Sequence, residues 1–146
     1  MLHKEENLSV NNKHKIKTHT QMTENELSYK IIGAALEVRK TLGVGLLENA
    51  YEIALAYELK GFGFKVKRQL LLPLKYKDEL IENAYRIDLI VEDKVIIEVK
   101  SVLEIHPIFY SQVLTYLKLT SIKLGLLINF NTPLIKDGIH RIVNKL

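Results

Sequence analysis

The sequence predicts a mixed α/β domain of the α+β type, in which helices cover one mixed central sheet. Two observations predict this class. Apolar residues recur at helical spacing, then alternate, then return to helical spacing, in the order helix, helix, three strands, helix, strand, strand. The length of 146 residues is that of a single domain. The three consecutive strands should form an antiparallel meander, and the following helix should lead to another strand of the same sheet.

The first two elements are helices with clear boundary signals. Thr23 and Glu26 form a capping-box pattern, which predicts a helix that continues to about Leu42. Gly43 then supplies a residue suited to ending it. A second helix is expected over about 46–60.

The remaining elements follow from a change in spacing. Apolar and polar residues alternate from Phe64, which predicts strands, and Pro107 suits the first turn of a helix. A short apolar run after that helix indicates a buried strand. The expected ranges are strands at 64–76, 80–91, 95–101, 124–129 and 139–143, and a helix at 107–119.

Composition and charge narrow the class of protein. The chain is 47% hydrophobic and 26% charged and has no cysteine, which excludes disulfides and thiolate metal sites. No apolar run reaches the roughly 20 residues of a membrane span, and the first 20 residues do not resemble a secretory leader. We therefore expect a cytoplasmic protein without a membrane partner.

The net charge of +4 fits a nucleic-acid partner, but its distribution matters. Residues 1–22 hold four Lys and two Glu, which leaves 17 basic and 15 acidic residues in the remainder. We interpret 1–22 as a flexible tail and 23–146 as the folded domain. Because that domain is nearly neutral, any basic surface depends on clusters such as Lys65, Lys67 and Arg68.

Charged residues in the middle of two neighbouring strands are the strongest functional signal. Asp88 lies in the second predicted strand, and Glu98 and Lys100 share one face of the third. A three-residue loop at 92–94 would put Asp88 opposite Glu98, whereas a two-residue turn would put them on different faces. We predict the three-residue loop.

A divalent cation would explain such a pair, because facing carboxylates destabilise a sheet and buried charges are costly. Mg²⁺ binds carboxylates, water and phosphate oxygens, and the Val99 carbonyl would add a ligand. Lys100 would then orient water or offset charge on a phosphate. The alternative is a structural network of Asp88 and Glu98 with Arg86 and Lys100, and the spacing alone favours neither interpretation.

The same residues resemble a known superfamily. Asp88 followed by Glu98-Val99-Lys100 resembles the Asp…(Asp/Glu)-x-Lys motif of the PD-(D/E)XK nucleases, with Ile87 in place of the name-giving proline. The segment from Gly45 through Glu48 to Tyr51 resembles the Gly-x-x-Glu-x-x-Tyr signature of the GxxExxY family within it. Gln112 and Tyr116 resemble a Gln-x-x-x-Tyr motif, and the likeness extends over roughly two-thirds of the chain.

This resemblance implies a restriction-endonuclease-like core and a nuclease that hydrolyses phosphodiester bonds with Mg²⁺ or Mn²⁺, with DNA as the favoured substrate. Asp88 and Glu98 would bind the metal, Glu48 would add a carboxylate directly or through water, and Lys100 would be catalytic. Gln112 would contact the site or the bound strand. The candidate nucleic-acid contacts are Arg68, Arg86 and Tyr116.

Other interpretations of these residues stay open. In the alternative interpretation, the chain is a catalytically silent nucleic-acid-binding or scaffold module that keeps the fold. Glu48 would then be a solvated residue in the first turn of a helix, Tyr116 a core residue, and Arg68 and Arg86 ion-pair partners. A single small domain that cuts both strands of a duplex would be expected to act as a homodimer.

Overall fold

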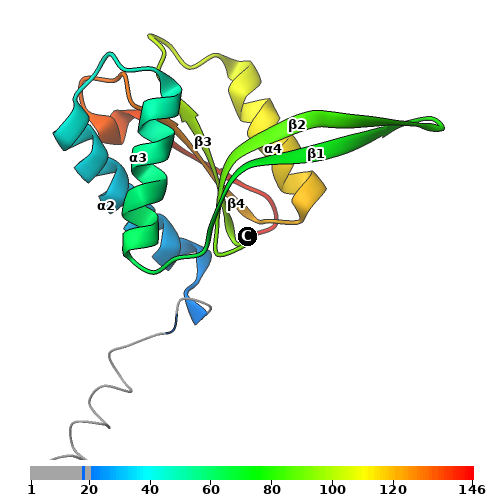
Figure 1. Ribbon diagram of the computed structural model, residues 1–146, viewed down its shortest axis with the longest axis horizontal. Helices are drawn as coiled ribbons and strands as arrows, with labels where there is room; N and C mark the ends of the chain where they lie inside the picture. The colour runs from blue at the N-terminus through cyan, green and yellow to red at the C-terminus, as the bar shows by residue number, and fades with distance from the viewer. Residues whose placement is uncertain (1–17, 19–20) are drawn as a thin grey trace, which may run out of the picture.

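The computed structural model describes residue 18 and residues 21–146 (Figure 1). The prediction of a flexible tail at 1–22 falls almost entirely outside these residues. The described chain contains two helices, then a three-stranded meander, a third helix, a fourth strand, a short 3₁₀ helix and a fifth strand. This order is the one that the sequence predicts, apart from the 3₁₀ helix η2 (Ile135–Gly138).

The first two helices begin and end close to the predicted residues. Helix α2 (Glu24–Leu42) starts after Thr23, whose side chain accepts a hydrogen bond from the Glu26 N–H over 3.1 Å. Gly43 follows with a φ of 71°, a conformation that glycine adopts without strain. Helix α3 (Glu48–Gly61) starts two residues later than predicted, so that Glu48 is its first residue.

Five strands form one mixed sheet in the order β1-β2-β3-β4-β5. The strands β1, β2 and β3 pair antiparallel, β3 and β4 pair parallel, and β4 and β5 pair antiparallel. Helix α4 (Pro107–Thr120) connects the parallel pair. The predicted meander and crossover are therefore confirmed. The strands are β1 (Val66–Tyr76), β2 (Glu79–Val91), β3 (Val95–Lys100), β4 (Leu124–Asn129) and β5 (Ile139–Val143).

The sheet separates two hydrophobic cores. Helices α2 and α3 cover one face and α4 covers the other, as Figure 1 shows. Successive residues of β3 alternate between the cores, with Ile97 in the first and Ile96 in the second. Helix α4 lies so close to β4 that a Cβ atom on Gly125 would come within 2.5 Å of the Val113 side chain.

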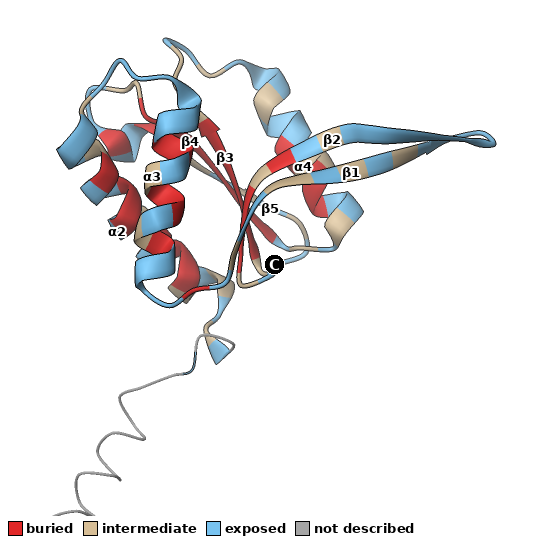
Figure 2. Ribbon diagram, viewed as in Figure 1, coloured by how far each residue is buried: buried red, intermediate tan, exposed pale blue. Residues whose placement is uncertain are grey.

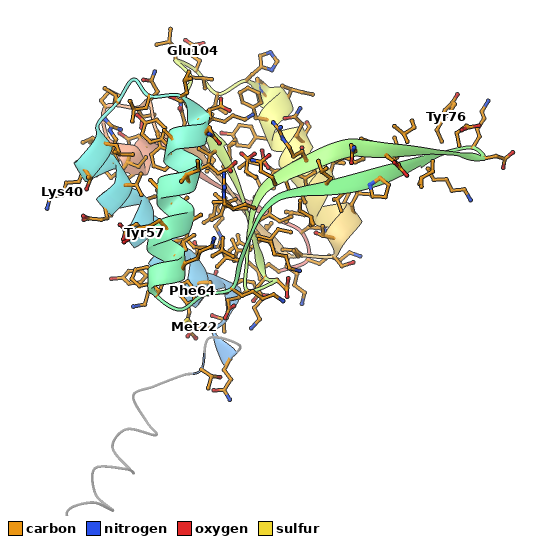
Figure 3. The ribbon with its side chains drawn as sticks, viewed as in Figure 1. Met22, Lys40, Tyr57, Phe64, Tyr76 and Glu104 are labelled. Carbon is orange, nitrogen blue, oxygen red and sulfur yellow. The ribbon has the colours of Figure 1, made fainter. Side chains whose placement is uncertain are left out.

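Strands β1 and β2 continue past the body of the domain as a two-stranded arm, here defined as residues 71–85 (Figure 1). Most of the arm is exposed (Figure 2), and Tyr76 lies at its far end (Figure 3). The ladder between β2 and β3 covers only residues 89–91 of β2. Strand β2 therefore separates from β3 next to Asp88, and β1 and β2 continue together into the arm.

Candidate active site

The loop between β2 and β3 sets the positions of the two predicted carboxylates. Val91 pairs with Val95, so the loop consists of residues 92–94. The predicted three-residue loop is therefore confirmed. Its register brings Asp88 level with Glu98, as the sequence argument required.

The two carboxylates replace backbone pairing where the strands diverge. The ladder ends at the pair of Leu89 and Ile97. Beyond this pair, the Asp88 N–H donates to Glu98 Oε1 over 3.0 Å, and the Val99 N–H donates to Asp88 Oδ2 over 2.9 Å. Each side chain thus satisfies a backbone group of the opposite strand, which fixes both carboxylates at this point. The same register would put Arg86 opposite Lys100, but these residues do not pair in the ladder, because β2 has separated from β3 by then.

Burial raises the pKa of both carboxyls, and the charge of a neighbouring carboxylate raises each pKa further, Asp88 acting on Glu98 and Glu52 acting on Asp88. Glu98 is 6% exposed, and burial followed by the charge of Asp88 raises its pKa to about 8. Burial also raises the pKa of Asp88 to about 6, while the Val99 N–H opposes this change. The doubly ionised pair is therefore unfavourable unless a cation compensates it.

An open cleft extends from α3 across this pair to α4. Its α3 end and its α4 end share Glu48, Arg86 and Asp88. The α3 end adds Glu52. The α4 end adds Glu98, Lys100, Gln112 and Tyr116. The cleft thus unites all the predicted site residues except Val99, which contributes its N–H to Asp88, and Arg68.

Lys100 and Tyr116 have different partners within the cleft. The Lys100 ammonium lies 4.3 Å from the centroid of the Phe109 ring. Tyr116 is buried, and its ring packs edge-on against Tyr85 at 6.1 Å. Burial, and then the charges of Glu98 and Asp88, raise the pKa of the Tyr116 hydroxyl. Tyr116 is therefore both a core residue and part of the cleft wall.

The basic cluster suggested by the sequence is largely neutralised. Lys65 and Lys67 both pair with Asp93, at 3.0 and 2.9 Å. Arg68 pairs with Glu52 at 2.7 Å. The cations that line the cleft itself are Arg86 and Lys100.

Glu52 is the site residue that the sequence analysis missed. It is only 3% exposed, lines the cleft, and accepts hydrogen bonds from Arg68 and Gln69. Its charge also contributes to raising the pKa of Asp88. Glu52 follows Glu48 by four residues, so the two share a helix face. That spacing was the available signal.

Comparison with known proteins identifies the family. The family model of the PD-(D/E)XK nuclease superfamily matches residues 25–142. The chain belongs to this superfamily. Its mixed five-stranded sheet and helices are those of the restriction-endonuclease-like fold, as predicted. The narrower assignment to the GxxExxY family stays a prediction.

Two further comparisons add little to the superfamily assignment. No curated protein matches the chain. The crystal structure of SSO0001 is similar with 22% identity and a TM-score of 0.48, over 68% of this chain and 51% of that one. This chain thus spans about half the length of that protein. None of the described helices is long and apolar enough to cross a bilayer.

The donor set of this PD-(D/E)XK domain fits a hard divalent cation. Half-buried Asp88 and buried Glu98 offer carboxylate oxygens at one point, where the charge of Asp88 raises the pKa of Glu98. Within the described residues, no three His, Cys, Asp or Glu side chains form a group suited to holding a metal ion. The cleft therefore offers a two-carboxylate site, and the role of Glu48 as a further ligand stays a prediction.

Proposed function

We propose that this chain is a divalent-cation-dependent nuclease that hydrolyses phosphodiester bonds of DNA. The observation that carries the proposal is the reciprocal pair of half-buried Asp88 and buried Glu98, which is repulsive and lies in an open cleft beside Lys100. Stability alone does not explain a buried carboxylate next to a half-buried one at one point of a sheet. A site that binds Mg²⁺ or Mn²⁺ and a phosphate group does.

Each residue of the cleft has a role that its position supports. Asp88 and Glu98 would hold the cation, which when bound would polarise the phosphodiester and activate water. Lys100 would offset the negative charge that develops on the phosphate. Arg86 is exposed at the same cleft, so its guanidinium would bind a flanking phosphate.

Other residues of the cleft support this arrangement. Gln112 is exposed on α4 and would contact the bound strand. Glu48 stands at the first turn of α3 and would hold cation-bound water from the rim. Arg68 is engaged by Glu52, so its proposed role changes from a nucleic-acid contact to holding that carboxylate in place.

Cleavage of labelled substrates tests the proposal. The panel would contain linear duplex, single-stranded and branched DNA together with RNA, with Mg²⁺, Mn²⁺ or EDTA. We expect cation-dependent cutting of DNA that falls about 10²–10³-fold in Lys100→Ala, because one charge-stabilising group is lost.

A matched variant controls for loss of charge. Lys118 is exposed in the last turn of α4, outside the cleft, so Lys118→Ala should cut like the wild type. If the wild type cuts no substrate above the level of Lys100→Ala, the nuclease proposal is wrong. Cutting of RNA alone would correct the substrate class and keep the reaction.

A further inference from the structure

The Lys100 ammonium contacts an aromatic ring instead of a carboxylate. It lies 4.3 Å from the Phe109 centroid, whereas the other two lysine–ring contacts in the described chain measure 5.4 and 5.6 Å. Within the described residues, this ammonium makes no hydrogen bond or ion pair. A cation at this distance from a ring face is attracted by the negative face of the π system.

This arrangement is notable because two carboxylates lie close by. Lys100 is two residues from Glu98 on the same strand and lines the same cleft as Asp88. Its positive charge acts on both carboxyls, whose pKa it lowers in opposition to burial. A flexible lysine so placed would ordinarily pair with one of them.

The surrounding structure fixes the Phe109 ring. Phe109 is the third residue of α4, a helix that starts at Pro107 and is capped by the His106 side chain, which accepts from the Ile108 N–H over 3.2 Å. The ring is half-buried and packs against the core between α4 and the sheet. It also meets the His106 ring edge-on at 6.4 Å. The ring is therefore a rigid support for the ammonium.

We propose that Phe109 is a positioning residue for Lys100. Its ring holds the ammonium beside the carboxylate pair without forming an ion pair with it. Asp88 and Glu98 then stay available to a divalent cation, and the ammonium stays available to a phosphate. This inference rests on the proposed function and explains how the Lys100 ammonium is kept apart from the carboxylates of Asp88 and Glu98.

Removal of the ring should let Lys100 compete with the divalent cation. In Phe109→Leu the ammonium would pair with Glu98 or Asp88, and Mn²⁺ affinity should fall about tenfold, the lower range for loss of a supporting group around a metal site. Phe109→Tyr keeps the ring and should keep the affinity. Phe109→Leu combined with Lys100→Met removes the competing charge and should restore it.

Nuclear magnetic resonance provides a readout independent of both catalysis and metal. Lysines of the full chain are converted to ¹³C-dimethyl-lysine, which keeps their charge, and the Lys100 signal is assigned by its loss in Lys100→Arg. The ring should move the Lys100 methyl signal upfield of those of exposed lysines such as Lys118 and Lys123. This displacement should persist in Phe109→Tyr and disappear in Phe109→Leu.

The outcomes separate this inference from the proposed function. A Lys100 signal at the position of the exposed lysines would overturn the contact. A displaced signal with equal Mn²⁺ affinity in wild type and Phe109→Leu would overturn the positioning role. Loss of affinity in Phe109→Leu that Lys100→Met does not restore would indicate a general packing defect, which also overturns it. A wild type that binds no Mn²⁺ would overturn the metal site, and with it this role, whatever the methyl signal shows.

Discussion

Strands β3 and β4 lie side by side, have six residues each and are buried along almost their whole length (Figure 2). The buried polar side chains of the two strands nevertheless differ in their partners. In β4 the polar residue is Asn129, which makes three hydrogen bonds to the backbone of Val102 and Asn131. In β3 the buried polar residue is Glu98, which accepts one backbone hydrogen bond and faces a second carboxylate. A satisfied polar group supports the fold, whereas a repulsive one indicates a binding site.

The largest expected effect is in β4. Asn129→Ala should lower the free energy of unfolding by about 3 kcal/mol, because three backbone groups lose their partner at a residue that is 1% exposed. Chemical denaturation would measure the change. Asn144→Ala, whose side chain makes no hydrogen bond within the described residues, should differ little from the wild type. A loss below 1 kcal/mol for Asn129→Ala would show that the hydrogen bonds of Asn129 do not stabilise β4, and the proposed difference from Glu98 in β3 would be wrong.

The next largest effect is the stabilisation of the folded protein by a divalent cation bound at Asp88 and at Glu98 of β3. Mg²⁺ or Mn²⁺ at about 100 times its dissociation constant should stabilise the wild type by about 2.7 kcal/mol, because only the folded chain has the site. Thermal unfolding during a cation titration would measure this. The double variant Asp88→Asn with Glu98→Gln should show no such gain. Equal stabilisation of both proteins would show that the cation binds elsewhere.

Glu98→Gln should stabilise the metal-free protein, which is the opposite sign from Asn129→Ala. The folded-state pKa of Glu98 is about 8, above its ordinary value of 4.5, so the folded protein binds more protons than the unfolded chain between these values. The free energy of unfolding therefore falls as pH rises from about 4.5 to 8. At pH 8 the variant should be more stable than the wild type, and near pH 4.5 the two proteins should hardly differ.

Unfolding in EDTA across this pH range would test the sign. Glu79→Gln is the matched control, since Glu79 is exposed at the start of β2. It should leave the pH dependence of wild-type stability unchanged. A Glu98→Gln variant that is destabilised at pH 8 would show that the carboxylate, despite its repulsion by Asp88, contributes to the fold as Asn129 does.

The smallest effect is expected in the arm. Leu80 is 59% exposed there, so Leu80→Lys should change the free energy of unfolding by no more than about 0.5 kcal/mol. Leu126→Lys, at a buried position of β4, should prevent stable folding by comparison. A strong loss of stability in Leu80→Lys would show that the arm is packed against another surface in solution.

The sequence predicted the elements and their order because both depend on local signals. The capping residue Thr23, the alternation along β3 and the position of Pro107 each act within a few residues. The parity argument for the loop at 92–94 succeeded for the same reason, since two short strands and one loop leave few registers. These signals, together with the Asp88 and Glu98-Val99-Lys100 motif, predicted the restriction-endonuclease-like fold and the centre of the candidate site.

Only the tertiary structure decided which charges meet. The pairing of Arg68 with Glu52, of Lys65 and Lys67 with Asp93, and of Lys100 with the Phe109 ring joins residues from different elements. No local pattern specifies such contacts, because they depend on how α3, α4 and the diverging β2 strand pack around the sheet. The sequence by itself determined the chemistry that the cleft can hold, and the packing of distant elements decided which of its charged groups stay available.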